Sequence, residues 1–390
     1  MPFSVLQDEL TALDAKGLRR TRRTLDAAQS AHVTVDGKKV IAFCSNDYLG
    51  LANHPELIAA AQAGASTYGV GAGASHLVLG HARAHEQLEE HLAAFVNLPR
   101  ALLFSTGYMA NLGVVTALLG REDAVFADRL NHASLNDACL LARAQFKRFA
   151  HNDVVQLERL LVGSKAKRKL IVVDAVFSMD GDIAPVPELL ALAERYDAWL
   201  LLDDAHGFGV LGANGRGVLE HFGLQHPRVI YMATLGKAAG VFGAFVAGDD
   251  TLIEMLMQRA RTYIYTTALP PLLACAVSKS IELIAAGAPL RQQLNENIIQ
   301  LKHILRESSL PAWRLLPSLT AIQPLVIGDN RAATAVAEKL AARSVLVPAI
   351  RPPTVPQGTA RLRISLSAAH TADDVRVLGD ALIAVGKEMS

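Results

Sequence analysis

The chain has 390 residues, of which 51% are hydrophobic and 19% charged, and its formal net charge is +1. This composition excludes a disordered protein, and a charge near zero gives no general attraction to nucleic acid or membranes. Cys44, Cys139 and Cys275 are far apart and include no CxxC pair, which argues against a disulfide framework or a cysteine zinc site. No apolar stretch reaches membrane-spanning length, and the acidic N-terminus does not resemble a signal peptide. We therefore expect a cytoplasmic protein.

The first part of the chain combines a helix, a hairpin and a loop. Residues 4–28 have the pattern of an amphipathic helix followed by a basic run, and 33–41 predict a short hairpin with Asp36-Gly37 at its turn. A polar loop then leads into a helix that begins after Pro55. The glycine-rich stretch 69–75 follows a helical segment, whereas a dinucleotide-binding loop follows a strand. We therefore interpret these glycines as a close approach to a ligand or a second subunit.

Three histidines follow this loop. The spacing of His81, His85 and His91 is not the HExxH pattern of zinc enzymes, so we expect them to decorate a helix face and we predict no metal site.

From residue 100 onward, strands and helices alternate. The predicted strands are 101–104, 123–127, 169–177, 199–203, 229–233 and 244–247, with helices at 108–119 and 187–196. Long apolar runs such as KLIVVDAVF are typical of central parallel strands that are covered on both faces. After residue 270 the pattern changes to long helices, strands near 321–327 and 360–367, and a helix from Thr371 with a capping box to Asp374. We predict three parts: 1–48, a large α/β domain at 49–275 and a smaller α+β domain at 276–390.

Residues with chemical use follow the predicted strands of the large domain. Ser105-Thr106-Gly107 opens a helix and offers N–H groups to a phosphate. The later strands are followed by Asn131 and His132, by Ser178, by Asp203 and His206, and by Thr234 and Lys237. Ligands of α/β sheets bind at the carboxyl ends of the strands. Although a single lysine is usually only solvated, a lysine, an acid, an imidazole and phosphate donors together match the needs of pyridoxal 5′-phosphate (PLP).

These residues also occur in motifs that resemble the α-oxoamine synthase family nearly end to end. The motifs are SNDYLGL (45–51), LFSTGYMAN (103–111), ADRLNHASL (127–135), FSMDGD (177–182), DDAHGFGVLG (203–212), TLGK (234–237), PPTVP (352–356) and RLRISLSAAHT (361–371). The resemblance implies the aspartate-aminotransferase-like fold (fold type I), with a large, mostly parallel sheet domain and a smaller α+β C-terminal domain. It further implies a PLP-dependent acyltransferase that is a homodimer with its active site at the interface.

The resemblance assigns roles to individual residues. It implies that Lys237 carries the cofactor as a Schiff base and moves the α-proton of the substrate, and that His132 stacks on the cofactor ring. The remaining cofactor residues would be Asp203 at the ring nitrogen, His206 and Ser178 at the ring hydroxyl, and Thr234 with the backbone of Gly107 and Tyr108 at the phosphate. The substrate residues would be Arg363 at the amino-acid carboxylate, Thr354, His132, and an N-terminal arginine, either Arg20, our choice, or Arg22 or Arg23.

Three functions remain open at this stage. SNDYLGL, ADRLNHASL and FAHNDV (149–154) are most similar to family members that condense L-alanine with a pimeloyl thioester, carried by coenzyme A or acyl-carrier protein, and release CO₂. The alternatives are a sister enzyme that uses glycine or another amino acid with a different acyl group, and a catalytically silent binding protein. One departure is that Ala72 and Ala74 stand where relatives usually have serine or glycine, so side-chain phosphate contacts are not expected there.

Overall fold

A computed structural model describes residues 3–308 and 313–389 of the chain. By its contacts the chain divides into two compact units. The larger unit consists of residues 46–178 and 182–292, and the smaller of residues 1–45, 179–181 and 293–390. The predicted division into 1–48, 49–275 and 276–390 stays a prediction.

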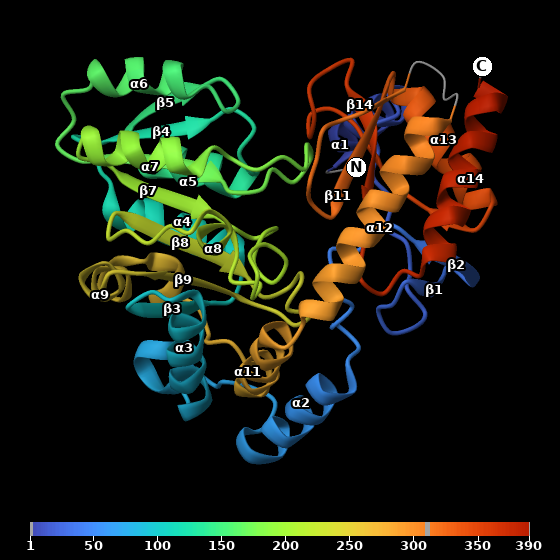
Figure 1. The fold of residues 1–390 in the computed structure, drawn as a ribbon. Coiled ribbons are helices and arrows are strands. Elements are labelled where there is room, and N and C mark those ends of the chain that lie inside the picture. The colour runs from blue at the N-terminus through green and yellow to red at the C-terminus, as the bar shows by residue number, and fades with distance from the viewer. Residues whose placement is uncertain (1–2, 309–312, 390) are drawn as a thin grey trace. The chain divides into compact units, whose positions relative to one another are not determined.

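The larger unit is built on a seven-stranded sheet (Figure 1) whose strand order is β3-β9-β8-β7-β6-β4-β5. The five consecutive strands β8, β7, β6, β4 and β5 are parallel to one another, whereas β9 runs antiparallel to both β8 and β3. The strands are β3 (Arg100–Phe104), β4 (Ala124–Asp128), β5 (Gln145–Phe149), β6 (Lys169–Asp174), β7 (Trp199–Asp203), β8 (Val229–Thr234) and β9 (Ala244–Gly248). This arrangement confirms the mostly parallel sheet.

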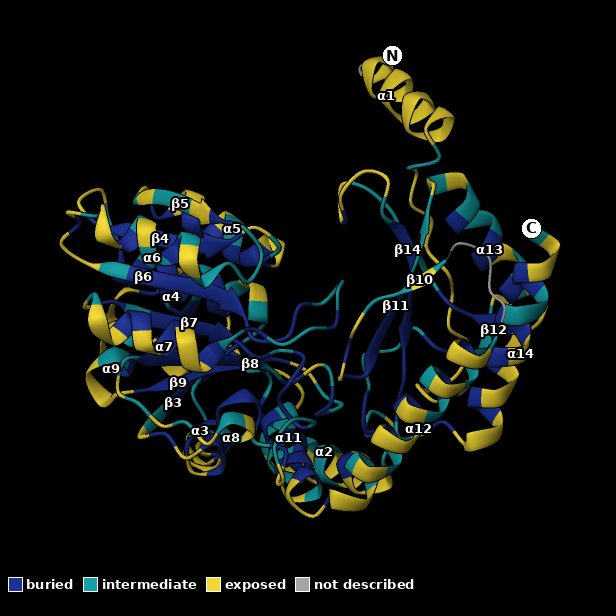
Figure 2. Cartoon of the chain, turned by 45° about the horizontal axis from the view of Figure 1, so that its top comes forward, coloured by how far each residue is buried: buried dark blue, intermediate teal, exposed yellow. Residues whose placement is uncertain are grey.

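Both faces of this sheet are buried, as the continuous apolar runs predicted (Figure 2). On one face, Val125, Val172 and Ile230 pack with residues of α4 and α5. On the other face, the ring of Phe245 contacts Phe208. The helices of this unit are α2 (Pro55–Tyr68), α3 (Arg83–Val96), α4 (Gly107–Leu118), α5 (Ala133–Leu141), α6 (Val154–Val162), α7 (Val186–Arg195), α8 (Val218–Phe222), α9 (Asp250–Arg259), α10 (Arg261–Ile264) and α11 (Pro271–Ala285), with a π-helical turn η1 (His76–Gly80).

The smaller unit contains two sheets. One has the order β1-β2-β12 and the other β10-β11-β14-β13. The elements are α1 (Ser4–Ala15), β1 (His32–Val35), β2 (Lys38–Ala42), β10 (Arg314–Leu315), β11 (Ile322–Gly328), α13 (Asn330–Ala342), β12 (Val345–Leu346), β13 (Ala349–Ile350), β14 (Ala360–Ser365) and α14 (Ala372–Met389). The helix α12 (Ala288–Glu307) begins in the larger unit and continues into the smaller one.

Two elements of this unit confirm predictions from local sequence signals. The predicted hairpin is present as β1 and β2, with Asp36 and Gly37 both at positive φ in the turn. At α14, the Thr371 hydroxyl accepts from the Asp374 N–H at 3.1 Å while the Asp374 carboxylate accepts from the Thr371 N–H at 2.9 Å. This reciprocal pair confirms the capping box.

The predicted helix ahead of the basic run is present as Ser4–Ala15, and none of its residues is buried (Figure 2). Two expectations about strands were wrong in detail. The strand predicted at 169–177 ends at Asp174, and β5 was missed because its sequence, QFKRF, mixes polar with apolar residues at the edge of the sheet.

The histidines after the glycine-rich loop do not simply decorate a helix face. Only the exposed His91 fits that description, since His81 precedes α3 and His85 is fully buried. His85 and His81 lie beside His76, whose pKa burial and the two neighbouring rings lower to about 3.

Within the described residues, no single helix is long and apolar enough to cross a membrane, although α11 and α12, bent by 70° at their junction, pass that test as a pair.

Candidate active site

Lys237 lies in the loop that follows β8 and is half-buried. Its Nζ is 2.9 Å from Nε2 of His206, which follows β7. The loop closes at Gly240, where φ is +70° and a Cβ would lie 2.6 Å from the backbone nitrogen of Ala52. Only glycine fits this close approach without displacing the backbone, so the fold holds the lysine loop against the segment after Leu51.

His206 connects Lys237 to Tyr48 through its second ring nitrogen. The Tyr48 hydroxyl is fully buried, lies 2.7 Å from His206 Nδ1 and donates to Asn46 Oδ1 at 3.2 Å. A hydroxyl that donates to Asn46 accepts from the Nδ1–H of His206, which leaves Nε2 as the acceptor for the Lys237 amine. The contacts therefore form a directional chain from Lys237 through His206 and Tyr48 to Asn46.

Asp203, the last residue of β7, is buried and held by hydrogen bonds at both carboxylate oxygens. Oδ2 accepts from Asn111 Nδ2 at 2.7 Å and Oδ1 accepts from the Ala205 N–H at 3.1 Å. The Asn111 amide also donates to Ser134 Oγ at 2.9 Å, and Ser134 Oγ lies 2.8 Å from His132 Nδ1. Asp203 and His132 are thus linked through two polar side chains.

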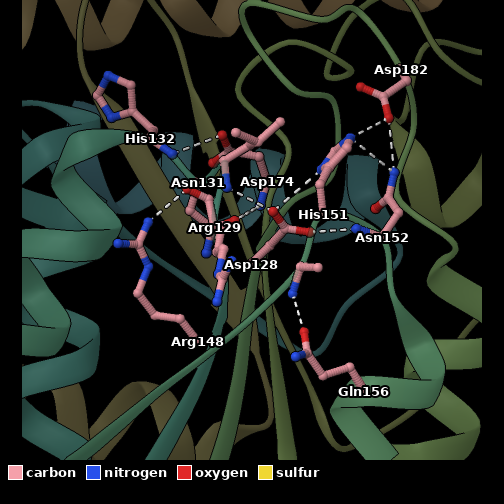
Figure 3. Close-up of polar contacts among 12 residues, drawn as sticks. Asp128, Arg129, Asn131, His132, Arg148, His151, Asn152, Gln156, Asp174 and Asp182 are labelled. Carbon is pink, nitrogen blue, oxygen red and sulfur yellow. Dashed lines mark hydrogen bonds and ion pairs between the residues drawn. The ribbon is translucent and has the colours of Figure 1, made fainter. Parts of the chain in front are cut away.

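The backbone of His132 is held by Asp174, at the end of the neighbouring strand β6 (Figure 3). Its N–H donates to Asp174 Oδ2 at 2.9 Å, and the Asp174 N–H donates to Asn131 Oδ1 at 3.0 Å. Burial lowers the pKa of His132 although the Asp203 charge acts in the opposite direction. Burial and the charge of Asp203, its partner in the β6–β7 register, raise the pKa of Asp174 well above its ordinary value. The His132 ring is therefore neutral near pH 7.

A second polar cluster surrounds Asp128 at the end of β4 (Figure 3). Asp128 is fully buried and accepts from the Asn152 N–H at 2.7 Å, while His151 lies 3.3 Å from Asp128 and 2.8 Å from Asp182. Burial opposes a charge on the His151 ring, but the two carboxylates outweigh it and raise the His151 pKa to about 10. This ion cluster ties the loop after β6 to the end of β4.

The residues predicted for a phosphate lie where α4 begins. Thr106 caps this helix by accepting from the Met109 N–H at 3.2 Å, and a Cβ placed on Gly107 would lie 3.9 Å from the Cβ of Thr234. The Tyr108 side chain is partly exposed and its hydroxyl donates to Asp137. A helix N-terminus without a side chain at Gly107, beside a hydroxyl residue, is a suitable anion site.

The other predicted residues occupy separate places. Ser178 is half-buried in the loop that follows β6. In the smaller unit, Arg363 on β14 is buried and donates to Ser365 Oγ at 2.9 Å, whereas Thr354 and Arg20 lie in exposed loop segments. The structure therefore brings Lys237, His206, Asp203 and His132 together at the strand ends of the larger unit, with Gly107 beside Thr234. It describes Arg20, Thr354 and Arg363 only within the smaller unit.

Comparison with known proteins decides the family. The model of the family "Aminotransferase class I and II" matches residues 38–382. An 8-amino-7-oxononanoate synthase of Nitrosospira multiformis is 62% identical over 98% of this chain and 96% of its own length.

The chain belongs to the class I and II aminotransferase family, and within it to the α-oxoamine synthases. Among solved structures of the family, a serine palmitoyltransferase with PLP is 31% identical, with a TM-score of 0.93 and coverage of 99% of this chain and 98% of its own. An 8-amino-7-oxononanoate synthase of Francisella tularensis is 32% identical, with a TM-score of 0.78 and coverage of 90% and 98%. These likenesses confirm the fold type I architecture predicted from the motifs.

The cofactor of this PLP-dependent α-oxoamine synthase is consistent with the residues present. A lysine amine, a buried carboxylate held by two hydrogen-bond donors, a neutral imidazole and a helix N-terminus are the donor set that PLP requires. All of them belong to the larger unit.

Several site residues were missed by reasoning from the sequence. Asn111, Ser134 and Tyr48 lie within quoted motifs, but only the fold shows that they contact Asp203, His132 and His206. For Asn111 the signal available in the sequence was a single amide in an otherwise largely apolar predicted helix, whereas Tyr48 and Ser134 stand among other polar residues and carried no such signal. Asp174, the one carboxylate inside the apolar run KLIVVDAVF (169–177), carried the same signal as Asn111.

Proposed function

We propose that this chain condenses L-alanine with a pimeloyl thioester and releases CO₂ and the free thiol carrier, the reaction of an 8-amino-7-oxononanoate synthase in biotin biosynthesis. The observation that carries the proposal is that curated relatives 56–62% identical to the chain over nearly its whole length bear that name. The serine palmitoyltransferase neighbour is only 31% identical.

In this proposal Lys237 performs two tasks, covalent attachment of the cofactor and transfer of the α-proton of alanine. When bound, PLP supplies an electron sink for the negative charge that forms at the α-carbon. The Lys237 amine takes the α-proton of alanine and later returns it. His206, held by Tyr48, receives a hydrogen bond from the Lys237 amine at 2.9 Å and thereby orients the lone pair of that amine. A base positioned within hydrogen-bond distance is the geometry that proton transfer requires.

The remaining roles follow from the chemistry of each side chain. Asp203 would pair with the ring nitrogen of the cofactor and stabilise its protonated form, because opposite charges attract strongly in a buried site. His132, neutral and anchored through Asp174, offers a flat face to the ring. Gly107, Tyr108 and Thr234 would hold the cofactor phosphate, and Ser178 with His206 would serve the ring hydroxyl.

Apart from His132, the proposed substrate residues lie in the smaller unit. Arg363 binds the carboxylate of alanine, a role suited to the planar guanidinium fork. Thr354 lies near the substrate, and Arg20 binds the acyl substrate. We also propose that the enzyme is a cytoplasmic homodimer with its active site at the interface, where the glycine-rich stretch 69–75 meets the second subunit.

A substrate panel tests the function directly. Purified holoenzyme is given L-alanine with pimeloyl-CoA, L-alanine with pimeloyl-acyl-carrier protein, glycine with acetyl-CoA or succinyl-CoA, and L-serine with palmitoyl-CoA, and thiol and CO₂ release are measured. The L-serine reaction is included because of the likeness to serine palmitoyltransferase.

We expect turnover with L-alanine and a pimeloyl thioester that exceeds turnover of every other pair by at least tenfold. Turnover only with glycine or serine would contradict the proposal and favour a sister enzyme. A protein that binds PLP but turns over no pair would support the silent binding protein instead.

A further inference from the structure

Three histidines outside the candidate active site converge beside α3. One ring nitrogen each from His76, His81 and His85 lies within 4.8 Å of the other two, the one such group of three metal-ligating residues among the described parts of the chain. His76 Nδ1 and His81 Nδ1 are 2.9 Å apart. The π-helical turn η1 brings His76 to His81, and the N-terminus of α3 adds His85.

Two of the three rings already have the outer partners that metal-bound histidines use. His85 Nε2 lies 2.6 Å from the carbonyl oxygen of Leu269, and His81 Nε2 lies 3.2 Å from a carboxylate oxygen of Glu86. A carbonyl or carboxylate fixes the proton on Nε2, so that Nδ1 carries the lone pair that binds a metal. The Nδ1 atom of His85 presently accepts from the Ala82 N–H at 2.9 Å.

The site is rigid on one side and open on the other. His85 is fully buried, and the His76 ring stacks on Tyr263 with centroids 4.9 Å apart and planes 10° apart. His81 is partly exposed. His76, His81 and Tyr263 line a cavity of about 460 Å³ in the larger unit. A metal held by three ring nitrogens would therefore keep a fourth position toward this cavity, as zinc does in sites with three protein ligands.

We propose that Nδ1 of His76, His81 and His85 bind one divalent transition-metal ion of the class of Zn²⁺. Binding replaces two hydrogen bonds, that between His76 and His81 and that from Ala82 to His85, with three metal–nitrogen bonds. The proton shared between the two Nδ1 atoms moves to a free ring nitrogen or to solvent, because a metal-bound nitrogen must be deprotonated. It ties the segment after the glycine-rich loop to α3. This inference is independent of the proposed function, because none of these residues belongs to the strand-end site.

The test uses holoenzyme without an affinity tag, treated with a chelator that is then removed. Zn²⁺ alone is titrated by equilibrium dialysis with metal analysis, and Co²⁺ is added separately because a tetrahedral site gives it a characteristic visible absorption. We expect one Zn²⁺ per chain. His81→Gln should weaken binding at least tenfold, and Glu86→Gln should weaken it by roughly tenfold because it removes only an outer partner.

His91→Gln is the matched control, since His91 is an exposed histidine of the same helix. It should bind Zn²⁺ like the wild type. His81 and Glu86 are not fully buried, so these variants should fold, and circular dichroism with a thermal melt of each metal-free protein verifies this. Absence of Zn²⁺ binding by the wild type at millimolar metal would overturn the proposal. So would unchanged affinity in His81→Gln, or an equal loss in His91→Gln.

Discussion

Tyr48→Phe tests the hydrogen-bond chain behind the lysine. The substitution removes one hydroxyl that is 2.7 Å from His206 Nδ1 and leaves the aromatic ring, which lies 6.0 Å from the His206 ring, in place. Tyr48 is 0% exposed, so solvent does not directly replace the lost acceptor. The Nδ1–H of His206 then remains without this partner in the interior.

The size of the effect follows from the cost of such a group. A buried donor left without an acceptor costs about 1–3 kcal/mol. If that cost falls on the step in which Lys237 moves the proton, kcat/KM for L-alanine decreases by roughly fivefold to 150-fold. The assay is thiol release from the pimeloyl thioester under limiting L-alanine, with the thermal melt measured in parallel.

Tyr265→Phe provides the control, because this tyrosine is 70% exposed and should leave kcat/KM unchanged. If Tyr48→Phe retains kcat/KM within twofold of the wild type and an unchanged melting temperature, the chain from Lys237 to Asn46 has no role in proton transfer.

Three further predictions concern stability and substrate binding. Burial raises the pKa of Asp204 from 3.8 to about 7, so folding favours the protonated carboxyl. As the pH rises from 3.8 to about 7, the free energy of unfolding of the wild type should therefore decrease by up to about 4 kcal/mol relative to that of Asp204→Asn. Parallel pH profiles from urea unfolding would contradict this. Gly181→Ala should lower the free energy of unfolding by at least about 2 kcal/mol more than Gly37→Ala does. Both glycines have φ near +72°, but a Cβ at 181 would lie 2.4 Å from a carbonyl oxygen, whereas one at 37 would meet nothing within 4 Å. Equal denaturation midpoints would refute the clash. Arg363→Lys should raise KM for L-alanine about tenfold with kcat nearly unchanged, because lysine lacks the bidentate fork; an unchanged KM would remove Arg363 from the carboxylate site.

Elements with a strong local signal could be predicted from the sequence. The run WLLLD gave the bounds of β7 without error, since a strand buried on both faces must be apolar throughout. Pro55 marked the start of α2, and the capping box marked the start of α14. That the polar groups after the parallel strands lie at one edge of the sheet likewise followed from the rule that ligands bind at the carboxyl ends of such strands.

What could not be predicted depends on contacts between distant residues. Asn111 meets Asp203 across 92 positions of the chain, and nothing local distinguishes it from any other polar residue in a helix. Residues 179–181 group with the smaller unit although they follow a central strand of the larger one. There the Gly181 carbonyl accepts from the hydroxyls of Ser318 and Thr320. Such pairings are properties of the fold and not of any window of sequence.

The histidines beside α3 illustrate the same limit. Their spacing excluded the HExxH pattern, and that exclusion was correct for a single helix. The π-helical turn places Nδ1 of His76 2.9 Å from Nδ1 of His81, a geometry that neither the α-helical nor the strand periodicity contains.

The assignment of Lys237 as the residue that carries PLP is tested most directly by locating the covalent bond between the chain and PLP. The holoenzyme is treated with borohydride, digested and mapped by mass spectrometry, alongside Lys237→Ala and the control Lys279→Ala, which replaces a lysine on α11. We predict that the cofactor is found on the peptide that contains Lys237, is lost in Lys237→Ala and is kept in Lys279→Ala. Modification of another lysine in the wild type, or a modified chain in Lys237→Ala under the same conditions, would contradict it.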